Sequence, residues 1–140
     1  MPNPLARLLS PAQAAVLAEF LRFGTVGAIG VVVDAATVYG LRAAIGLYWA
    51  GALAYFVAAS SNWLINRLWT FRGKGSGPAH LQWATFLLAN GVGFVVNRGT
   101  YFVLITVSAV AFDYPILAIA CGTAVGMFIN FYLSRRFVFR

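Results

Sequence analysis

Acidic side chains are nearly absent from this sequence. Its 140 residues include three acids, Glu19, Asp34 and Asp113, against ten lysines and arginines. Charged residues make up 9% of the chain, whereas about a quarter of a soluble domain is charged. So few charges could not cover the surface of a soluble particle of this length. The composition therefore excludes an ordinary soluble enzyme and a disordered tail, and it predicts an integral membrane protein.

Cysteine and histidine are equally scarce. Cys121 is the single cysteine, so it cannot form a disulfide within the chain. His80 is the single histidine and no acid lies near it, which argues against a metal site or another bound cofactor. No nucleophile with a neighbouring base and no pair of carboxylates appears, so we do not expect an enzyme.

Apolar residues dominate what remains, at 61% of the chain. A membrane-spanning helix needs about 20 mostly apolar residues. Four runs meet this need: Phe20 to Leu41, Leu47 to Ile65, Trp83 to Ile105, and Pro115 to Leu133. The sequence therefore predicts an all-α integral membrane protein with four transmembrane helices.

The segments between and before these runs are short. Ser10, Pro11 and Gln13 match a helix-starting capping box. Residues 11–19 then form either a short amphipathic helix on the cytoplasmic surface or an extension of the first span. We expect a cytoplasmic segment at 1–19, a first two-helix repeat at 20–72, a flexible linker at 73–80 and a second two-helix repeat at 81–140. Pro115 after Tyr114 is typical of a helix start.

The basic residues indicate how the chain is oriented. Eight of the ten would share one side of the membrane in a four-span arrangement: Arg7, Arg22, Arg67, Arg72, Lys74, Arg135, Arg136 and Arg140. Arg42 lies at the opposite end, and Arg98 lies inside the third span. Since cytoplasmic loops carry the excess of Lys and Arg, both termini and the linker are predicted to be cytoplasmic. The basic excess is thus explained by a multi-pass protein of the cell's inner membrane, and a nucleic-acid partner is not expected.

The two halves of the chain resemble each other. Gly30, Asp34 and Thr37 align with Gly93, Asn97 and Thr100. A second pattern, N-x3-[NS]-R-x-[WF]-[TV]-F-R, occurs at 62–72 and again at 130–140. Each half holds an even number of spans, so the two repeats are predicted to be parallel and related by an axis along the membrane normal.

The doubled motif has a chemical interpretation. Asn62 and Asn66, four residues apart, share one helix face, and amides in hydrocarbon need partners. Arg67 lies at headgroup level, where a guanidinium can hold a phosphate in two-point contact. Asn130 and Arg135 repeat this pattern. The aromatic residues that follow would anchor the chain at the membrane interface: Trp69, Phe71, Phe137 and Phe139. Alternatively, the asparagines only join helices and the arginines only set topology.

Two charges lie within the predicted spans. Asp34 and Arg98 fall at similar depth, and a charge there costs several kcal/mol, on the order of 3, unless it is paired or hydrated. A permanent Asp34–Arg98 ion pair would join the halves. In the functional alternative, Arg98 receives a lipid phosphate while Asp34 and Asn97 orient it or bind sugar hydroxyls.

Small residues form stripes along the predicted spans. Gly24, Gly27 and Gly30 lie near one face of the first span, and Gly91 and Gly93 occupy the matching part of the third. Such stripes allow helices to pack closely. Tyr48, Trp49, Trp83 and Tyr114 are typical of membrane-interface anchors.

These motifs together resemble the GtrA-like family of small four-span membrane proteins. The resemblance covers about residues 20 to 140. It depends on Arg22-Phe23 with Gly27, on Asp34, and on the two motifs that begin at Asn62 and Asn130. It implies a flippase that moves a polyprenyl-phosphate-linked monosaccharide from the inner to the outer leaflet for cell-surface polysaccharide glycosylation. It also leaves a non-transporting role open, in which the protein recruits or stabilises a membrane glycosyltransferase.

Two further expectations concern partners. Four helices make a thin bundle around a large polar headgroup, so we expect a homo-oligomer in contact with membrane lipid. A small multidrug-type exporter is disfavoured, since the spans hold no Glu and carry Arg98 instead.

Overall fold

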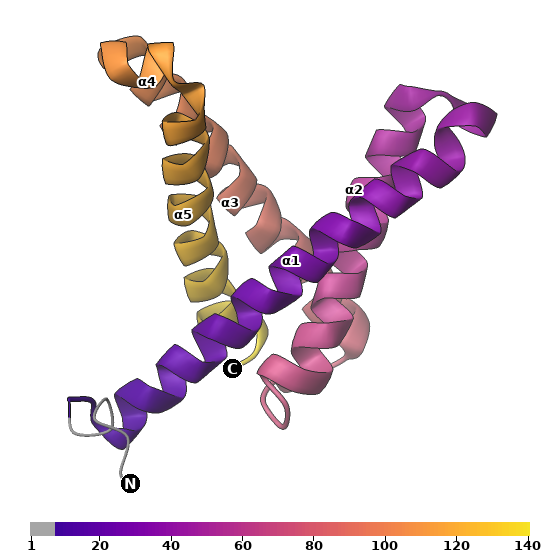
Figure 1. Cartoon of the computed structure of the whole chain (residues 1–140). Coiled ribbons are helices and arrows are strands. Elements are labelled where there is room, and N and C mark those ends of the chain that lie inside the picture. Colours follow the sequence, from indigo (N-terminus) through magenta and orange to yellow (C-terminus); the bar gives the residue numbers. More distant parts are fainter. Residues whose placement is uncertain (1–7) are drawn as a thin grey trace, which may run out of the picture. The chain divides into compact units, whose positions relative to one another are not determined.

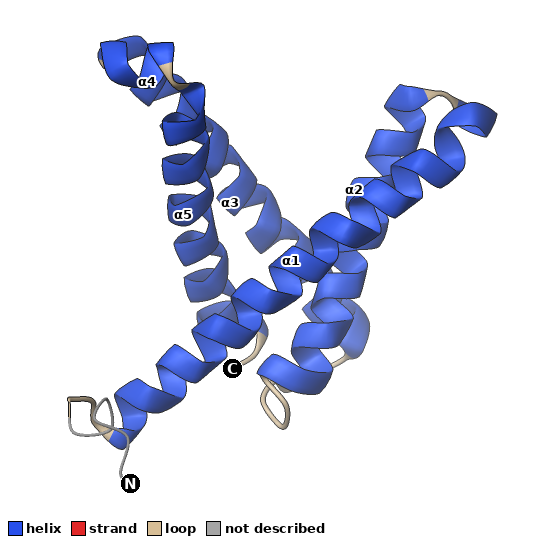
Figure 2. Ribbon diagram, in the orientation of Figure 1, coloured by secondary structure: helices blue, strands red, loops and turns tan. Residues whose placement is uncertain are grey.

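The computed structural model describes residues 8–140, and in this part of the chain every regular element is helical, without a strand (Figure 2). Arg7, one of the eight cytoplasmic cations predicted above, lies outside the described residues. The elements in chain order are α1 (Pro11–Ile45), α2 (Leu47–Ile65), η2 (Asn66–Thr70), α3 (Ala79–Val107), α4 (Ala109–Asp113), α5 (Pro115–Leu133) and η3 (Ser134–Val138). The all-helical fold class is confirmed.

The chain divides between Lys74 and Gly75 into two compact units. In the first, which we call unit 1, α1 packs along α2 and η2 as a helical hairpin (Figure 1). In the second, unit 2, α3 packs along α5 and η3, with α4 at the turn between them.

Helix α1 begins at the capping box predicted from the sequence. The Gln13 amide N–H donates to the Ser10 hydroxyl at 3.2 Å, and the Ser10 N–H donates to the Gln13 side chain at 2.8 Å. From Pro11 the helix runs unbroken to Ile45 and stops at Gly46, whose φ of 80° suits glycine. Residues 11–19 are therefore the first part of α1 and do not form a separate helix.

Three helical segments are long and apolar enough to cross a membrane: Pro11–Ile45, Ala79–Val107 and Pro115–Val138. Helix α2 has the bounds predicted from the sequence and, at 19 residues, a length of about 28 Å. Its apolar character is interrupted by Ser60, Ser61 and Asn62. That α2 is a fourth span stays a prediction.

The connection expected at residues 106–114 contains a helix that the sequence did not suggest. Ser108 caps α4 by accepting a hydrogen bond from the Ala111 N–H at 3.3 Å. Helix α5 then begins at Pro115, as predicted, with proline in the first turn.

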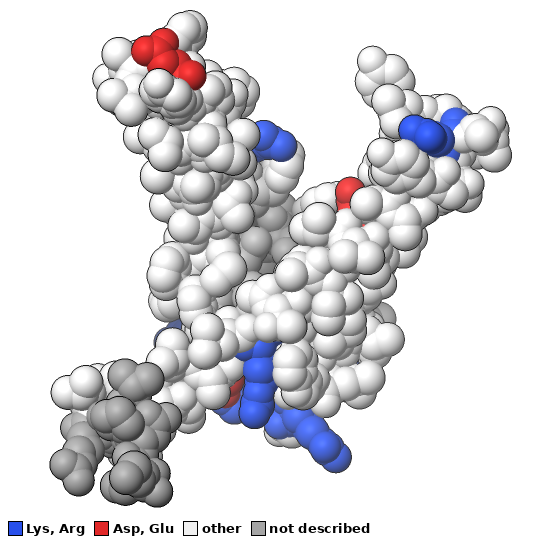
Figure 3. All heavy atoms as spheres, in the orientation of Figure 1, with Lys and Arg blue, Asp and Glu red and all other residues white. Residues whose placement is uncertain are grey.

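The outer surfaces of both units are mostly apolar. Large side chains such as Val31, Leu88 and Phe128 are exposed along the helices, and charged atoms occupy little of the surface seen in Figure 3. Surface of this kind is stable against lipid and unstable against water. The chain is therefore a membrane protein.

Candidate functional site

Each unit ends in a wide helical turn formed by the doubled motif. At the C-terminal end of α2, backbone hydrogen bonds join residues five apart in the sequence instead of four. The Phe71 N–H, for example, donates to the Asn66 carbonyl at 2.8 Å. After α5, the Phe139 N–H donates to the Ser134 carbonyl at 2.9 Å. Such π turns insert one extra residue into a helix and often occur at functional sites.

The π turns place an aromatic ring inside each unit. Phe71 contacts Phe23 edge to face with ring centroids 6.2 Å apart, and Phe139 contacts Phe86 in the same way at 6.1 Å. Phe71 and Phe139 are almost fully buried. The prediction that these two residues are interface anchors is therefore wrong, because they hold the turn against the first helix of their own unit.

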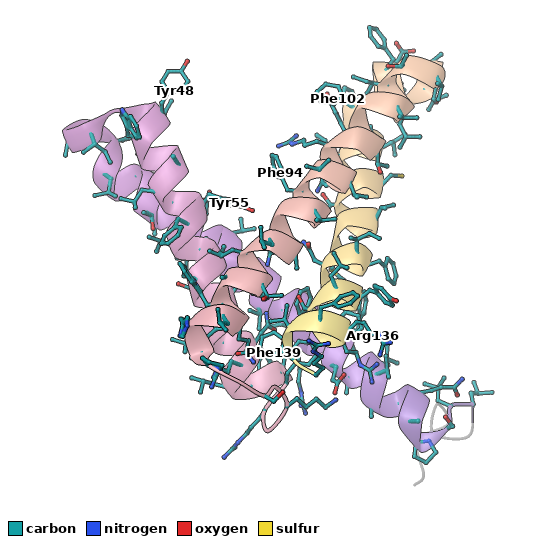
Figure 4. The ribbon with its side chains drawn as sticks, turned by 180° about the vertical axis from the view of Figure 1, so that it is seen from behind. Tyr48, Tyr55, Phe94, Phe102, Arg136 and Phe139 are labelled. Carbon is teal, nitrogen blue, oxygen red and sulfur yellow. The ribbon has the colours of Figure 1, made fainter. Side chains whose placement is uncertain are left out.

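The other two predicted anchors have a different environment. Trp69 and Phe137 are about half exposed, and the guanidinium of Arg22 lies 6.0 Å from the Trp69 ring centroid. An anchoring role at the lipid interface stays a prediction for Trp69 and Phe137. Tyr48, at the start of α2, projects away from the rest of its unit (Figure 4).

Asn62 and Asn130 occupy equivalent places at the closest helix contact of each unit. A Cβ atom on Gly30 would collide with the Asn62 amide, and a Cβ atom on Gly93 would collide with the Asn130 amide. The glycines thus make room for the asparagines. Gly27 and Gly91 have open space where a Cβ atom would lie, with no neighbour within 4 Å. Of the predicted glycine stripes, close packing therefore depends on Gly30 and Gly93.

Five buried side-chain oxygens along these motifs accept no hydrogen bond from any described residue. They are Asn62 Oδ1, Asn66 Oδ1 and Thr70 Oγ1 in unit 1, and Asn130 Oδ1 and Ser134 Oγ in unit 2. Asn66 and Ser134 are 1% and 0% exposed. Because native interiors pair nearly all buried polar atoms, these oxygens indicate places where water or a ligand completes the structure.

The motif arginines lie outside this interior. The Arg67 guanidinium is 5.8 Å from the ring centroid of Trp63, and Arg135 is exposed. Arg136 extends from the same end of unit 2 as Phe139 (Figure 4). Arg67 and Arg135 therefore remain accessible for contact with an anionic group at the ends of α2 and α5.

Asn97 and Arg98 lie on different sides of α3. A Cβ atom on Gly126 would approach the Asn97 Cβ to 2.9 Å, and one on Gly122 would approach the Asn97 carbonyl oxygen to 2.6 Å. Asn97 therefore lies at the crossing of α3 and α5. Arg98 is exposed, and its guanidinium lies 5.6 Å from the ring centroid of Phe94.

Asp34 is the unit 1 counterpart of Asn97. It is partly buried, and no described residue of unit 1 forms an ion pair or hydrogen bond with its carboxylate. In unit 2, residues 75–140, no acid pairs with Arg98. The Asp34–Arg98 pair would join residues of different units, and it stays a prediction.

Two buried polar residues near the start of α1 and α3 were not found by sequence reasoning. Glu19 is buried and forms an ion pair with Lys74. At the equivalent position of unit 2, Gln82 is buried beside Gly75. The repeat spacing of 63 residues that aligns Phe23 with Phe86 also aligns Glu19 with Gln82, and this alignment could have drawn attention to them.

No group of three His, Cys, Asp or Glu side chains gathers anywhere in residues 8–140. Cys121 is exposed on α5. The side chains that the doubled motif places inside each unit are amides and hydroxyls, a set suited to hydrogen bonding, while its arginines lie outside.

Comparison with known families agrees with this arrangement. Residues 22–139 match the family model of the GtrA/DPMS transmembrane domain. The chain belongs to this family. The matched region of this GtrA/DPMS domain contains both π turns as well as Asp34 and Arg98. No curated protein matches the chain.

Proposed function

We propose that this GtrA/DPMS-family protein is a translocase that moves a polyprenyl-phosphate-linked monosaccharide from the inner to the outer leaflet. The sugar would then be used in cell-surface polysaccharide glycosylation. The family supports a role in lipid-linked sugar translocation. In this proposal the protein lies in the cell's inner membrane, with α2 as a fourth span, the two units as parallel repeats and both termini in the cytoplasm. It supplies no catalytic group of its own.

The observation that carries this proposal is the environment of Arg98. Its guanidinium projects from the middle of an apolar helix, next to Phe94, with no acid of its own unit to neutralise it. A cation at that depth is costly unless it meets an anion or water. The phosphate of a lipid-linked sugar is an anion that could pair with Arg98, and pairing with a cation would lower the cost of moving that phosphate through hydrocarbon.

The remaining site residues would act at two levels. Arg67 and Arg135 receive the phosphate at the inner surface, and Arg98 receives it deeper in the membrane. Asn62, Asn66 and Asn130 would support the helices that hold these arginines, while Asp34 and Asn97 would orient Arg98 or bind sugar hydroxyls. Assembly of two or more copies would enclose the polar headgroup more fully.

The test is movement of the lipid-linked sugar by purified protein in vesicles. We expect wild-type protein alone to move it between leaflets. The Arg98→Leu variant should lose most of this activity, on the order of a hundredfold or about 2.7 kcal/mol in the barrier, because the phosphate loses its partner at depth. Thr106→Val, on the same helix, is the matched control and should retain the rate.

A second candidate function is recruitment or stabilisation of a membrane glycosyltransferase. It is favoured by the exposure of Arg72, Arg135 and Arg136 at the ends of the two units. In that case purified protein moves no lipid, Arg98→Leu has no effect on co-purification with the enzyme, and replacing the three arginines abolishes it. Full transport by a folded Arg98→Leu variant would contradict the translocation mechanism proposed here.

A further inference from the structure

We propose that unit 1 contains a hydrated internal column through which Asp34 exchanges a proton with the water at the Lys74 end of the unit. This gives the protein a proton-binding site that does not depend on whether it moves lipid.

The column consists of three side chains at four-residue spacing. Asn62, Asn66 and Thr70 each have a buried oxygen that accepts no hydrogen bond from the described residues. The collision of a Gly30 Cβ with the Asn62 amide shows that this face of α2 points toward α1. Asn66 and Thr70 are 1% and 4% exposed, so the buried face of α2 continues into η2.

Water is the ligand that fits this column. Asn62 and Asn66 are four residues apart at the end of α2, where Cβ atoms are about 5–6 Å apart, so one water can bridge their oxygens with ordinary hydrogen bonds. A metal cation would fit poorly beside Lys74 and Arg67. Such waters satisfy the buried oxygens and form a continuous hydrogen-bonded chain. The waters and the Thr70 hydroxyl can pass a proton, whereas the amides orient the waters.

One end of the column reaches the surface. Lys74 follows the π turn, forms an ion pair with buried Glu19, and has a side chain that is 45% exposed. Phe23, one helical turn after Glu19 on α1, contacts Phe71 of the π turn that precedes Lys74. Protons can therefore enter or leave where the Glu19–Lys74 pair meets solvent.

The other end of the column reaches Asp34. On α1, Asp34 lies one helical turn beyond Gly30, which contacts Asn62, and both belong to the face that packs against α2. Asp34 is 12 residues from Arg22 in the sequence, or about 18 Å along the helix. Its carboxylate has no partner among residues 8–74, the described part of unit 1. A proton that arrives there converts an unpaired anion within an apolar helix into a neutral acid.

Unit 2 has a neutral side chain, Asn97, at the position that corresponds to Asp34. Asn130 and Ser134 repeat the unpaired buried oxygens, and one turn beyond Gly93 the column ends at Asn97. An amide has nearly the same shape as a protonated aspartic acid. The packing of Asn97 against Gly122 and Gly126 therefore shows that a neutral side chain of this shape is stable at the helix crossing. Only unit 1 ends the column in a group that can exchange a proton.

Few other ionisable groups surround Asp34. On α2, which packs against it, the ionisable side chains are Tyr48 and Tyr55, and on η2 the only one is Arg67. Along α1 itself the ionisable residues are Glu19, Arg22, Tyr39 and Arg42, all at least five residues away from Asp34. Proton exchange at this depth is thus a property of Asp34 and of the column that leads to it.

Infrared spectroscopy can test this directly, because the chain has only three acidic side chains. Full-length protein in lipid vesicles is compared in acidic and alkaline buffer. We expect a carbonyl band of a protonated acid that disappears in Asp34→Asn and shifts in frequency in Asp34→Glu. It should persist in Asp113→Asn, which removes an exposed acid on α4. Transfer into D2O should then shift the band as the proton is exchanged.

The column is tested by the rate of that exchange. Asn66→Leu, or the isosteric Thr70→Val if Asn66→Leu fails to fold, should slow exchange by about tenfold or more, the effect of a barrier raised by about 1.4 kcal/mol. Ser134→Ala, which removes a buried oxygen of unit 2, is the matched control and should leave the rate unchanged. Two results would overturn the proposal: no protonated band assignable to Asp34, as a permanent ion pair with Arg98 would give, or unchanged exchange in folded Asn66→Leu or Thr70→Val protein.

Discussion

Single small residues decide how closely the two helices of each unit approach. Gly30 and Gly93 each make room for an asparagine side chain, and Gly122 makes room for the backbone of Asn97. The atoms that these glycines contact differ in how easily they could move if the glycine were replaced by a larger residue. An asparagine side chain can turn, whereas a backbone carbonyl in a helix cannot move without its helix.

This difference predicts the effect of Gly122→Ala. The new Cβ would lie 2.6 Å from the Asn97 carbonyl oxygen, so α3 and α5 must separate. We expect stability to fall by about 1–3 kcal/mol, measured by thermal unfolding in detergent micelles followed by circular dichroism. Gly99→Ala, which has nothing within 4 Å, should change stability by less than about 0.5 kcal/mol. Equal midpoints for the two variants would show that the contact does not limit helix packing.

At the scale of helices, the π turns decide which side chains of the doubled motif enter the interior. In a regular α-helix, the side chains after Asn66 or Ser134 would point in other directions around the helix axis than they do after the π turn. The wider turn brings Thr70 and Phe71, and likewise Val138 and Phe139, toward the first helix of their unit. Trp69 and Phe137 then point outward. One extra residue in the turn thus separates the packing aromatics from the exposed ones.

Helix α2 permits a direct test of the fourth span. In a background where Cys121 is replaced by Ala, Tyr48→Cys and Arg72→Cys introduce single labels before α2 and after η2. Both positions are exposed. We expect a membrane-impermeant maleimide to label Tyr48→Cys from the outside and Arg72→Cys from the inside, since about 28 Å of helix is enough to cross the hydrocarbon core. Labelling of both from one side would contradict a spanning α2.

At the scale of the whole molecule, the two units have similar helices but carry different charges at equivalent places in the first helix of each unit. Unit 1 has Asp34 where unit 2 has Asn97, and unit 2 adds Arg98. A carboxyl that exchanges protons and a guanidinium that binds phosphate would allow one chain to link proton movement with lipid movement. This link combines the proposed function with the proton site.

A proton gradient across the vesicle membrane tests the link. If one proton moves with each lipid, the steady-state ratio of labelled lipid between the leaflets should change by about tenfold per pH unit of gradient, since one pH unit is worth about 1.4 kcal/mol. In Asp34→Asn the ratio should not respond to the gradient. A wild-type ratio that does not change with the gradient would show that lipid translocation and proton exchange at Asp34 are not linked. An absence of lipid movement at any pH would contradict the translocase and leave the proton site untouched.

Much of the fold was predictable from the sequence. The scarcity of acids identified a membrane protein, and the apolar runs located α2 and α5 with their observed bounds. The capping box at Ser10 located the start of α1. The alignment of the motifs at Asn62 and Asn130 identified residues that have matching environments in the two units. These features depend on local hydrogen bonding and on average hydrophobicity, which a sequence expresses directly.

Other features depended on contacts between distant parts of the chain. The Glu19–Lys74 pair joins residues 55 positions apart, and the burial of Phe71 and Phe139 requires both the π turn and the neighbouring helix. The sequence determined that this protein enters a membrane as helices and that its two halves share a motif. Tertiary packing alone decided which aromatic, amide and acidic side chains face inward, because the direction of a side chain depends on the exact rotation of one helix against another.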